Sequence, residues 1–293
     1  MTRFAFLSDI HGNLPALDTV LAKIKFELKI PANNILCLGD IVGYYPWITE
    51  CVSTIRDLEI RTVAGNHDIA SSDSNPKNVF LTLSNPIAQE ALKFTRLVLE
   101  RSPDDLEYLK SLPSITRGNS YEAVHNSPAF VGGFEYVTTP DDAIKAIKAM
   151  QKEVAFIGHT HQPCVYKEHK KDDGETDVRY YDLNDLARET GRKPFKLDPG
   201  VKYLVNIGSV GQSRDSNPQA CFVVFDDEKK TIQYYRVDYD VREVQEAVRS
   251  SEYGKTTFEK LAKVYKKEMP KEHNGVPVST VGDFLAVRLE QGN

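Results

Sequence analysis

The chain has 293 residues, of which 41% are hydrophobic and 27% charged, a normal composition for a globular protein with a sizeable core. Its formal net charge of -5 argues against a general binder of long nucleic acids or other polyanions. The four cysteines show neither a CxxC pair nor zinc-finger spacing, and no apolar run approaches membrane-spanning length. A strand begins within three residues of the N-terminus and leaves no room for a signal peptide, so we expect a cytoplasmic protein.

The first third of the sequence alternates between strand-like and helix-like segments. In chain order we expect a strand at 4–7, a helix at 13–28, a strand at 35–38, a helix near 47–58 and a short strand at 61–64. Asn13 and Pro15 are typical of a helix N-terminus. The alternation indicates strand–helix–strand units and a largely parallel sheet.

The remaining sequence changes character after a helical stretch. We expect two helices between 85 and 112, a strand at 121–124, a helix at 141–150, and strands at 154–157, 202–207, 220–225 and 231–237. The last two strands are joined by a short charged connection of the hairpin type. The second half of the chain therefore looks more antiparallel than the first.

The domain organisation follows from these elements. We expect one domain over residues 1–293, with two stacked sheets and helices outside them. Residues 167–200 are rich in charged and turn residues and read as a solvated insertion. The tail beyond about residue 240 reads as amphipathic helices.

Polar side chains gather where the predicted strands end. Five strands are followed by Asp9 and His11, by Asp40, by Asn66 and His67, by His125, and by His159 and His161. Ligands of open α/β sheets collect at the carboxyl ends of strands, so these residues are the candidate site. Five of the seven histidines lie there, whereas His169 and His273 lie in charged segments and are expected on the surface.

The mixture of oxygen and nitrogen donors indicates the kind of metal. Mixed ligation of this type suits Mn, Fe or Zn better than Mg or Ca. The set is too large for one ion, and a two-metal site needs a bridging carboxylate, for which Asp40 is the natural candidate. Two ions about 3.5–4 Å apart can activate a water molecule and hold a phosphate for in-line attack.

These blocks resemble a known family. The order Asp9-x-His11, Gly39-Asp40, Gly65–Asp68, His125 and Gly158-His159-x-His161 is similar to that of the calcineurin-like metallophosphoesterases. Residues 39–44 and 206–215 further resemble a prokaryotic branch of small phosphoesterases. The resemblance covers nearly the whole chain and implies an α/β (α+β) fold, a four-layer αββα sandwich of two mixed β-sheets flanked by helices.

The resemblance also implies roles for the site residues. One metal would bind Asp9, His11, His161 and Asp40, and the second would bind Asp40, Asn66, His125 and His159. His67 matches the family position that approaches the leaving group, as a general acid or a transition-state hydrogen-bond donor. The two ions would be divalent transition metals, namely Mn, Fe or Zn, with Ni also compatible.

The sequence departs from the family pattern at one place. Phosphoprotein phosphatases of the superfamily carry an Asp-Arg pair shortly after the Gly-Asp motif, and here Gly43 and Tyr44 stand at those positions. This difference weakens the phosphoprotein phosphatase interpretation and agrees with the small phosphoesterase branch, in which diester substrates are common. Arg214 is the candidate for a replacement phosphate contact.

Three local interpretations stay open. Asp68 either orients a ligand or caps the following segment. Tyr44 either lines a substrate pocket, where a ring could stack a nucleobase, or packs its loop on the next helix. The aromatic residues between 130 and 136 are candidates for a substrate wall, core packing or a dimer contact.

The functional hypothesis is a metal-dependent phosphoesterase in which a hydroxide bridging two ions attacks phosphorus. Phosphodiester hydrolysis is favoured over phosphomonoester hydrolysis, and the expected substrate is a small phosphorylated molecule, with nucleotides among the candidates. The alternatives are a phosphoprotein or phosphomonoester phosphatase, a nuclease, which the charge disfavours, and an inactive interaction module of the same fold. We expect no membrane partner, and a homo-oligomer is compatible with the sequence.

Overall fold

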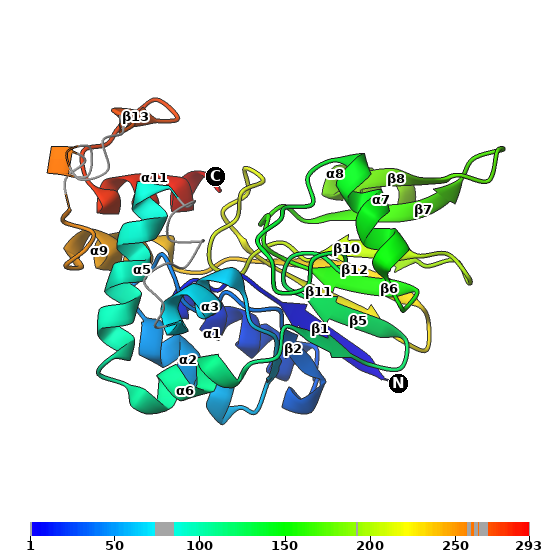
Figure 1. Cartoon of the computed structure of the whole chain (residues 1–293), viewed down its shortest axis with the longest axis horizontal. Helices are drawn as coiled ribbons and strands as arrows, with labels where there is room; N and C mark the ends of the chain where they lie inside the picture. Colours follow the sequence, from blue (N-terminus) through cyan, green and yellow to red (C-terminus); the bar gives the residue numbers. More distant parts are fainter. Residues whose placement is uncertain are drawn as a thin grey trace.

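The computed structural model describes residues 2–73, 85–191, 193–256 and 269–292, together with 259, 260 and 263 (Figure 1). Within these residues the chain forms two large mixed sheets and a small hairpin. None of the described helices combines the length and the apolar character that crossing a membrane requires.

The first sheet has six strands in the described part of the chain. Their spatial order is β3 (Arg61–Thr62), β2 (Ile35–Cys37), β1 (Arg3–Leu7), β11 (Ala220–Asp226), β12 (Thr231–Val237) and β9 (Phe195–Lys196). Strands β1, β2 and β3 are parallel, whereas β11, β12 and β9 continue the sheet in antiparallel pairs. The expected change from parallel to antiparallel pairing is confirmed within this one sheet.

The second sheet also has six described strands. Their spatial order is β4 (Ile115–Arg117), β5 (Tyr121–Val124), β6 (Val154–Ile157), β10 (Tyr203–Asn206), β7 (Cys164–Lys170) and β8 (Thr176–Asp182). Strands β5, β6 and β10 are parallel, and β4, β7 and β8 are antiparallel to their neighbours. Both sheets are therefore mixed.

Successive side chains of a central strand point to opposite faces of the sheet, so each sheet has an inner face and an outer face. In β1, Phe6 packs into the interior between the sheets, whereas Ala5 and Leu7 face the helices. In β6, Phe156 faces the same interior, and its ring stacks on Phe6 with centroids 3.8 Å apart. Because each central strand is buried on both faces, helices must cover the outer sides, and the predicted four-layer αββα sandwich is confirmed.

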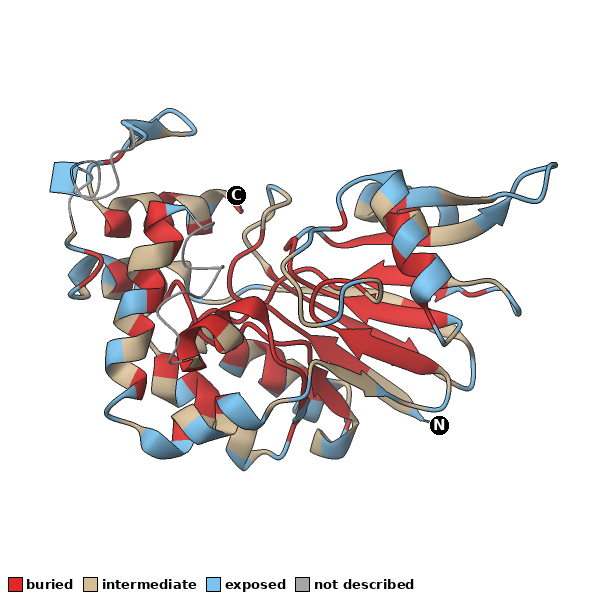
Figure 2. Cartoon of the chain, in the orientation of Figure 1, coloured by how far each residue is buried: buried red, intermediate tan, exposed pale blue. Residues whose placement is uncertain are grey.

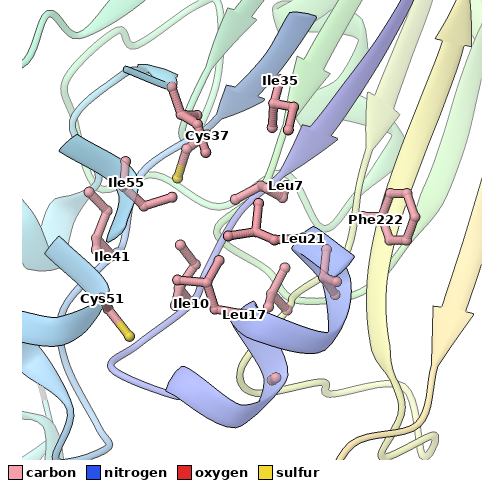
Figure 3. Close-up of a cluster of buried hydrophobic side chains, with 14 of the residues drawn as sticks. Leu7, Ile10, Leu17, Leu21, Ile35, Cys37, Ile41, Cys51, Ile55 and Phe222 are labelled. Carbon is pink, nitrogen blue, oxygen red and sulfur yellow. The ribbon is translucent and has the colours of Figure 1, made fainter. Parts of the chain in front are cut away.

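Helices α1 (Leu14–Ala22) and α2 (Ile48–Asp57) cover the outer face of the first sheet (Figure 3). Asn13 caps α1 as expected, because its side-chain oxygen accepts a hydrogen bond from the Ala16 amide. The predicted helix to residue 28 is not a single α-helix, since Lys23–Glu27 forms a π-helical turn. Leu17 and Leu21 of α1 pack against Leu7 in this layer.

Helix α7 (Pro140–Ala149) covers the outer face of the second sheet. Thr139 and Asp142 form a capping box at its start, with Pro140 in the first turn. Ala143 and Ile147 pack in one cluster with Ile157 of β6. Figure 2 shows the central strands of both sheets as buried, whereas edge strands such as β8 are largely intermediate or exposed.

A third group of helices lies beside the sandwich. It consists of α5 (Pro86–Leu99), α9 (Val241–Ser250) and α11 (Val281–Gln291), with α3 (Asn66–Ser72) and α6 (Pro103–Ser111) next to α5 (Figure 1). The two helices predicted between 85 and 112 are α5 and α6. In the tail, α9 and α11 are helical, but a hairpin of β13 (Glu272–His273) and β14 (Val276–Pro277), which the sequence did not suggest, precedes α11.

Residues 167–200, interpreted from the sequence as a solvated insertion, contain regular structure. They form the end of β7, strand β8, helix α8 (Leu183–Thr190) and strand β9. Tyr181, Leu186 and Phe195 of this segment are buried in the core between the sheets. Its charged residues lie mostly on the outside, so the segment combines a solvated face with edge strands of both sheets.

Candidate metal centre

The predicted ligands lie in loops at the carboxyl ends of β1, β2, β5 and β6 and at the start of α3. Five of them have backbone φ angles in the left-handed region: Asp9 (55°), His11 (56°), Asp40 (52°), His159 (67°) and His161 (60°). Residues with a side chain rarely adopt this conformation, and it persists only where the surrounding structure holds it. Contacts with neighbouring segments therefore hold these loops in their conformation.

Backbone contacts and two glycines hold these loops together. The Asp9 amide donates to the Gly39 carbonyl at 3.0 Å, and the His11 amide donates to the Asp40 carbonyl at 2.9 Å. A Cβ on Gly65 would lie 2.2 Å from Asp40 Oδ1, and one on Gly158 would lie 2.5 Å from Asp9 Oδ2. Glycine at these two positions lets the carboxylates approach the neighbouring strand ends.

Carbonyl groups fix the tautomers of the first pair of histidines. Nδ1 of His11 lies 3.2 Å from the Val42 carbonyl, and Nδ1 of His161 lies 2.5 Å from the Gln212 carbonyl. A carbonyl only accepts hydrogen bonds, so each ring donates from Nδ1 and leaves Nε2 as a bare lone pair. The two Nε2 atoms are nevertheless 3.0 Å apart.

Asp9 adds a carboxylate oxygen to this pair. Its Oδ1 lies 3.1 Å from His161 Nε2 and 3.9 Å from His11 Nε2. Within the described residues no hydrogen-bond donor is aligned with this buried oxygen. Three buried acceptor atoms facing one another repel unless a cation lies between them, so the donor set of Asp9, His11 and His161 fits a metal ion.

The tautomers of His125 and His159 are fixed in the same way. His125 Nδ1 lies 2.7 Å from the Leu38 carbonyl, and His159 Nε2 lies 3.2 Å from the Phe134 carbonyl. When both rings are neutral, the inward-facing atoms, His125 Nε2 and His159 Nδ1, are both acceptors, and they lie 3.2 Å apart. Such outer hydrogen bonds orient metal-binding histidines in general.

Two oxygens complete the second group of acceptors. Asn66 Oδ1 lies 3.0 Å from His125 Nε2, and Asp40 Oδ2 lies 3.4 Å from the same nitrogen. Asp40 Oδ2 is also 3.7 Å from His11 Nε2, which belongs to the first group. Asp40 is thus in reach of both groups, the position that a bridging carboxylate requires. The structure brings all seven predicted ligands together.

Burial and charge set the protonation of the four imidazoles. Burial lowers the pKa of His11 and His161 well below its ordinary value and lowers that of His159 to about 4. Burial also acts to lower the pKa of His125, but the charge and hydrogen bond of Asp40 outweigh it and raise this pKa to about 9. Three imidazoles are therefore neutral at neutral pH, as metal ligation requires, and the metal-free site retains one proton at His125.

His67 lies against the same site. Its backbone amide donates to Asp40 Oδ1 at 2.8 Å, and its ring centroid is 4.8 Å from that of His11. Ligand atoms of His67, His11 and Asp40 also lie within 4.8 Å of one another, so geometry alone does not distinguish a ligand from a catalytic donor here. The role of His67 at the leaving group stays a prediction.

Four of the seven predicted ligands, namely Asp40, Asn66, His159 and His161, line a cavity of about 270 Å³. Tyr44 lines this cavity, and its ring centroid is 4.8 Å from that of His11 and 5.0 Å from that of His67. Tyr44 is also buried in the cluster formed with α5, α9 and α11, so its side chain both lines the cavity and packs against helices. Arg214 lies on the cavity wall and hydrogen-bonds Gln212 Oε1 at 3.1 Å.

Asp68 ties two parts of the site together. Its Oδ2 accepts from the Gly65 amide at 3.0 Å, which caps α3, and its Oδ1 accepts from the Ile41 amide at 2.9 Å, next to Asp40. The capping role considered from the sequence is therefore present, and the second contact holds the backbone that follows Asp40. Burial and the Asp40 charge raise the pKa of Asp68 to about 7.

Sequence reasoning missed residues that act through the backbone or from another segment. The Phe134 carbonyl holds His159, and the Tyr136 ring stacks on the His159 ring with centroids 4.0 Å apart. Both residues line the cavity, which identifies this aromatic stretch as a wall of the site. The available signal was the cluster of aromatic residues itself, which a single sequence could not assign.

The sandwich fold with an Asp-, Asn- and His-rich site at its strand ends defines a metallophosphoesterase. A sequence model of the calcineurin-like phosphoesterase superfamily domain matches residues 2–230, and the chain belongs to this superfamily. The superfamily is metal-dependent, and its membership indicates a hydrolase of phosphoesters. The resemblance inferred from the sequence is confirmed.

Individual relatives agree with this membership. An uncharacterised protein of Methanocaldococcus jannaschii is 34% identical over 248 residues, which are 83% of this chain and 90% of that protein. A metallophosphoesterase structure from Sphaerobacter thermophilus is 28% identical, with a TM-score of 0.70 over 100% of this chain and 99% of that one. A hypothetical protein from Pyrococcus horikoshii shares the fold at 21% identity, with a TM-score of 0.63 over 85% of this chain and 93% of that one.

Proposed function

We propose that the protein hydrolyses a small phosphodiester with the help of two divalent transition metal ions. The observation that carries this proposal is the pair of buried acceptor groups that share Asp40 at the floor of an open cavity. Mn, Fe and Zn, and also Ni, suit this donor set. Nucleotides are candidate substrates, and a cytoplasmic location belongs to the same proposal.

The ligand assignment follows the two groups. Asp9, His11 and His161 would hold one ion, Asn66, His125 and His159 would hold the other, and Asp40 would bridge them. Ions bound there would supply an activated water at neutral pH and neutralise charge on the phosphoryl oxygens.

The other cavity residues act on the substrate. Burial lowers the pKa of His67, and the Arg214 charge lowers it further, so the imidazole is neutral at pH 7 and donates a hydrogen bond through its N–H. In our proposal this N–H stabilises the negative charge that develops on the leaving oxygen. Arg214 would contact a phosphoryl oxygen from the cavity wall, where its Nε is buried without a hydrogen bond among the described residues.

The diester preference is supported by the loop that follows Asp40. A Cβ on Gly43 would lie 2.6 Å from His11 Nδ1 and 3.0 Å from His67 Nδ1, so this position has no room for a carboxylate that would support His67. The Asp-Arg pair of the phosphoprotein phosphatases therefore has no counterpart at positions 43 and 44. A site that lacks this arginine suits the single negative charge of a diester better than a dianionic monoester.

The test compares two chromogenic substrates on protein that has been stripped of metal and reconstituted with Mn²⁺. We expect bis(p-nitrophenyl) phosphate to be hydrolysed faster than p-nitrophenyl phosphate. Asp40→Asn should abolish turnover and metal binding, whereas Asp141→Asn on the exposed start of α7 is the matched control and should change neither. Dominant monoester turnover would instead make the protein a phosphomonoesterase.

Metal analysis of the same samples interprets the outcome in which neither ester is hydrolysed. If neither ester is hydrolysed and the protein retains less than one ion per chain, the protein is an inactive member of the fold and the proposal is wrong. Two ions per chain together with Asp40-dependent turnover support it.

A further inference from the structure

Two contacts hold Tyr136 and its loop against the predicted metal ligand His159. The Tyr136 ring stacks on the His159 ring, with centroids 4.0 Å apart and planes 17° from parallel. The carbonyl of Phe134, two residues earlier in the same loop, lies 3.2 Å from Nε2 at the edge of that imidazole. Because the loop contacts His159 on its face and on its edge, the Tyr136 ring has a defined orientation at the cavity.

The phenol oxygen of Tyr136 lies beside Arg214, which lines the same cavity. Burial raises the pKa of Tyr136, whereas the charge of Arg214 and a hydrogen bond from this arginine act to lower it. A guanidinium can only donate hydrogen bonds, so the phenol oxygen is the acceptor in this pair. The O–H of Tyr136 therefore points to a different partner.

Two hydrogen-bond donors thus lie side by side at the metal ligands. Arg214 Nε is buried and has no acceptor among the described residues. In the same part of the chain no acceptor is found for the Tyr136 hydroxyl, and 48% of this residue is exposed, so a ligand in the cavity can reach it. Burial and then the charge of Arg214 lower the pKa of His161, which means that the guanidinium also lies close to the other group of ligands.

A purely structural role accounts for the ring of Tyr136 but not for its hydroxyl. Stacking on His159 requires only an aromatic ring, which phenylalanine would supply equally well. A phosphoryl oxygen is an anionic acceptor that can receive hydrogen bonds from both donors at once. The hydrogen bond from Arg214 also polarises the phenol, which strengthens donation from its O–H.

We propose that Tyr136 contacts the substrate, and that its hydroxyl donates a hydrogen bond to a phosphoryl oxygen beside the contact from Arg214. The proposal rests on the proposed phosphoesterase function and adds a substrate-binding residue to that site. In this scheme the ring of Tyr136 keeps His159 in place, while the hydroxyl and the guanidinium together hold the phosphoryl group at the metal ligands.

Tyr136→Phe retains the stacked ring and removes only the hydroxyl, so it isolates the proposed contact. In calorimetric titration of the Mn²⁺-loaded protein, this variant should bind inorganic phosphate about tenfold or more weakly than wild type, the usual size of a hydrogen bond to a charged group. Its content of Mn²⁺ and its melting temperature should not change. Tyr180→Phe is the matched control, because it removes an equally exposed hydroxyl (49%) from β8 and should leave phosphate binding unchanged.

A second substitution separates the ring from the hydroxyl. Tyr136→Leu removes both, so it should weaken phosphate binding as Tyr136→Phe does and also lower the affinity for Mn²⁺, because His159 loses one of its two loop contacts. If Tyr136→Phe already loses Mn²⁺, the hydroxyl acts on the metal centre and the proposed substrate contact is refuted.

A double-mutant cycle tests whether Tyr136 and Arg214 act on the same group. Arg214→Gln alone should weaken phosphate binding, and adding Tyr136→Phe to it should cost at least about threefold less than Tyr136→Phe costs in the wild-type background. Fully additive effects, or an unchanged phosphate affinity in folded Tyr136→Phe protein, would refute the proposed contact.

The two proposals fail in different ways. Asp40-dependent hydrolysis combined with an unchanged phosphate affinity in Tyr136→Phe would refute the contact and leave the phosphoesterase function in place. Phosphate binding that depends on the Tyr136 hydroxyl, without hydrolysis of either chromogenic ester, would support the contact and refute the hydrolytic function. If Mn²⁺-loaded wild-type protein binds no phosphate, the contact is refuted directly.

Discussion

Metal binding at pH 8 should release the proton of His125, in addition to the proton that a metal-activated water gives up. In the metal-free protein His11, His159 and His161 are neutral, because burial lowers the pKa of each. His125 is the exception, since Asp40 raises its pKa to about 9 against the effect of burial. A metal ion at His125 Nε2 must displace that proton, which no other ligand imidazole carries.

Measurement at pH 8 distinguishes the proton released by His125 from one released by Asp68. The pKa of Asp68 is raised to about 7, so near neutral pH an added metal would also release part of a proton from that carboxyl. At pH 8 Asp68 is mostly ionised and His125 is still mostly protonated. As the pH rises through about 9, His125 loses its proton before metal arrives, and the number of protons released should fall by about one.

The assay is calorimetric titration of the metal-free protein with Mn²⁺ in buffers of different ionisation enthalpy. The dependence of the observed heat on that enthalpy gives the number of protons released. The control variant Asp141→Asn should release the same number. A release near zero at pH 8, or a value that does not fall between pH 8 and 10, would refute the assigned tautomers and the His125–Asp40 pair.

Three further predictions concern stability, loop geometry and the leaving group. Two Mn²⁺ ions, each at about 100 times its dissociation constant, should stabilise the fold by about 5 kcal/mol and raise the melting temperature by roughly 10–20 °C in differential scanning calorimetry, whereas Asp40→Asn should show no such rise. Gly158→Ala should lower metal affinity about 10–100-fold by equilibrium dialysis, because its Cβ would lie 2.5 Å from Asp9 Oδ2; unchanged affinity would contradict this. His67→Asn should keep both ions and lower kcat about 10²-fold or more for a dialkyl diester, which must expel an alkoxide, but far less for a diester that expels p-nitrophenolate. Loss of an ion would make His67 a ligand.

Strand periodicity made the central layers predictable. Residues 154–157 and 231–237 were expected as strands and form β6 and β12 with the same bounds. Their apolar runs are short and flanked by turn residues, which distinguishes buried strands from helices. The edge strands β8 and β9 were missed because their charged and polar residues resemble a loop when the partner strand is not known.

The site was predictable to the level of its side chains. Asp and His residues directly after apolar strands are visible in a sequence, because the carboxyl ends of neighbouring parallel strands meet. The carbonyl groups that orient the histidines carry no such signal, since every residue has one. Tyr136 reaches the site from a loop, a contact that only the tertiary structure creates.

The strained loops predict where the metal-free protein loses structure first. Five ligands hold left-handed backbone conformations that cost on the order of 1 kcal/mol each, so together they cost about 5 kcal/mol, a large fraction of the net stability of a typical domain. The facing lone pairs of His11 and His161 add repulsion in the same loops. Metal removal should therefore open these loops well below the free energy of global unfolding.

Hydrogen exchange followed by mass spectrometry tests this expectation peptide by peptide. Mn²⁺ should slow exchange in segments 9–12, 39–43 and 158–161, where the amides of Asp9 and His11 donate across the site. Strands β11 and β12 belong to the first sheet, together with β1 and β2, but contribute no proposed ligand. This strand pair therefore serves as the internal reference. Equal slowing of the loops and of this reference pair would mean that the metal stabilises the whole fold uniformly, and would remove the argument from local strain.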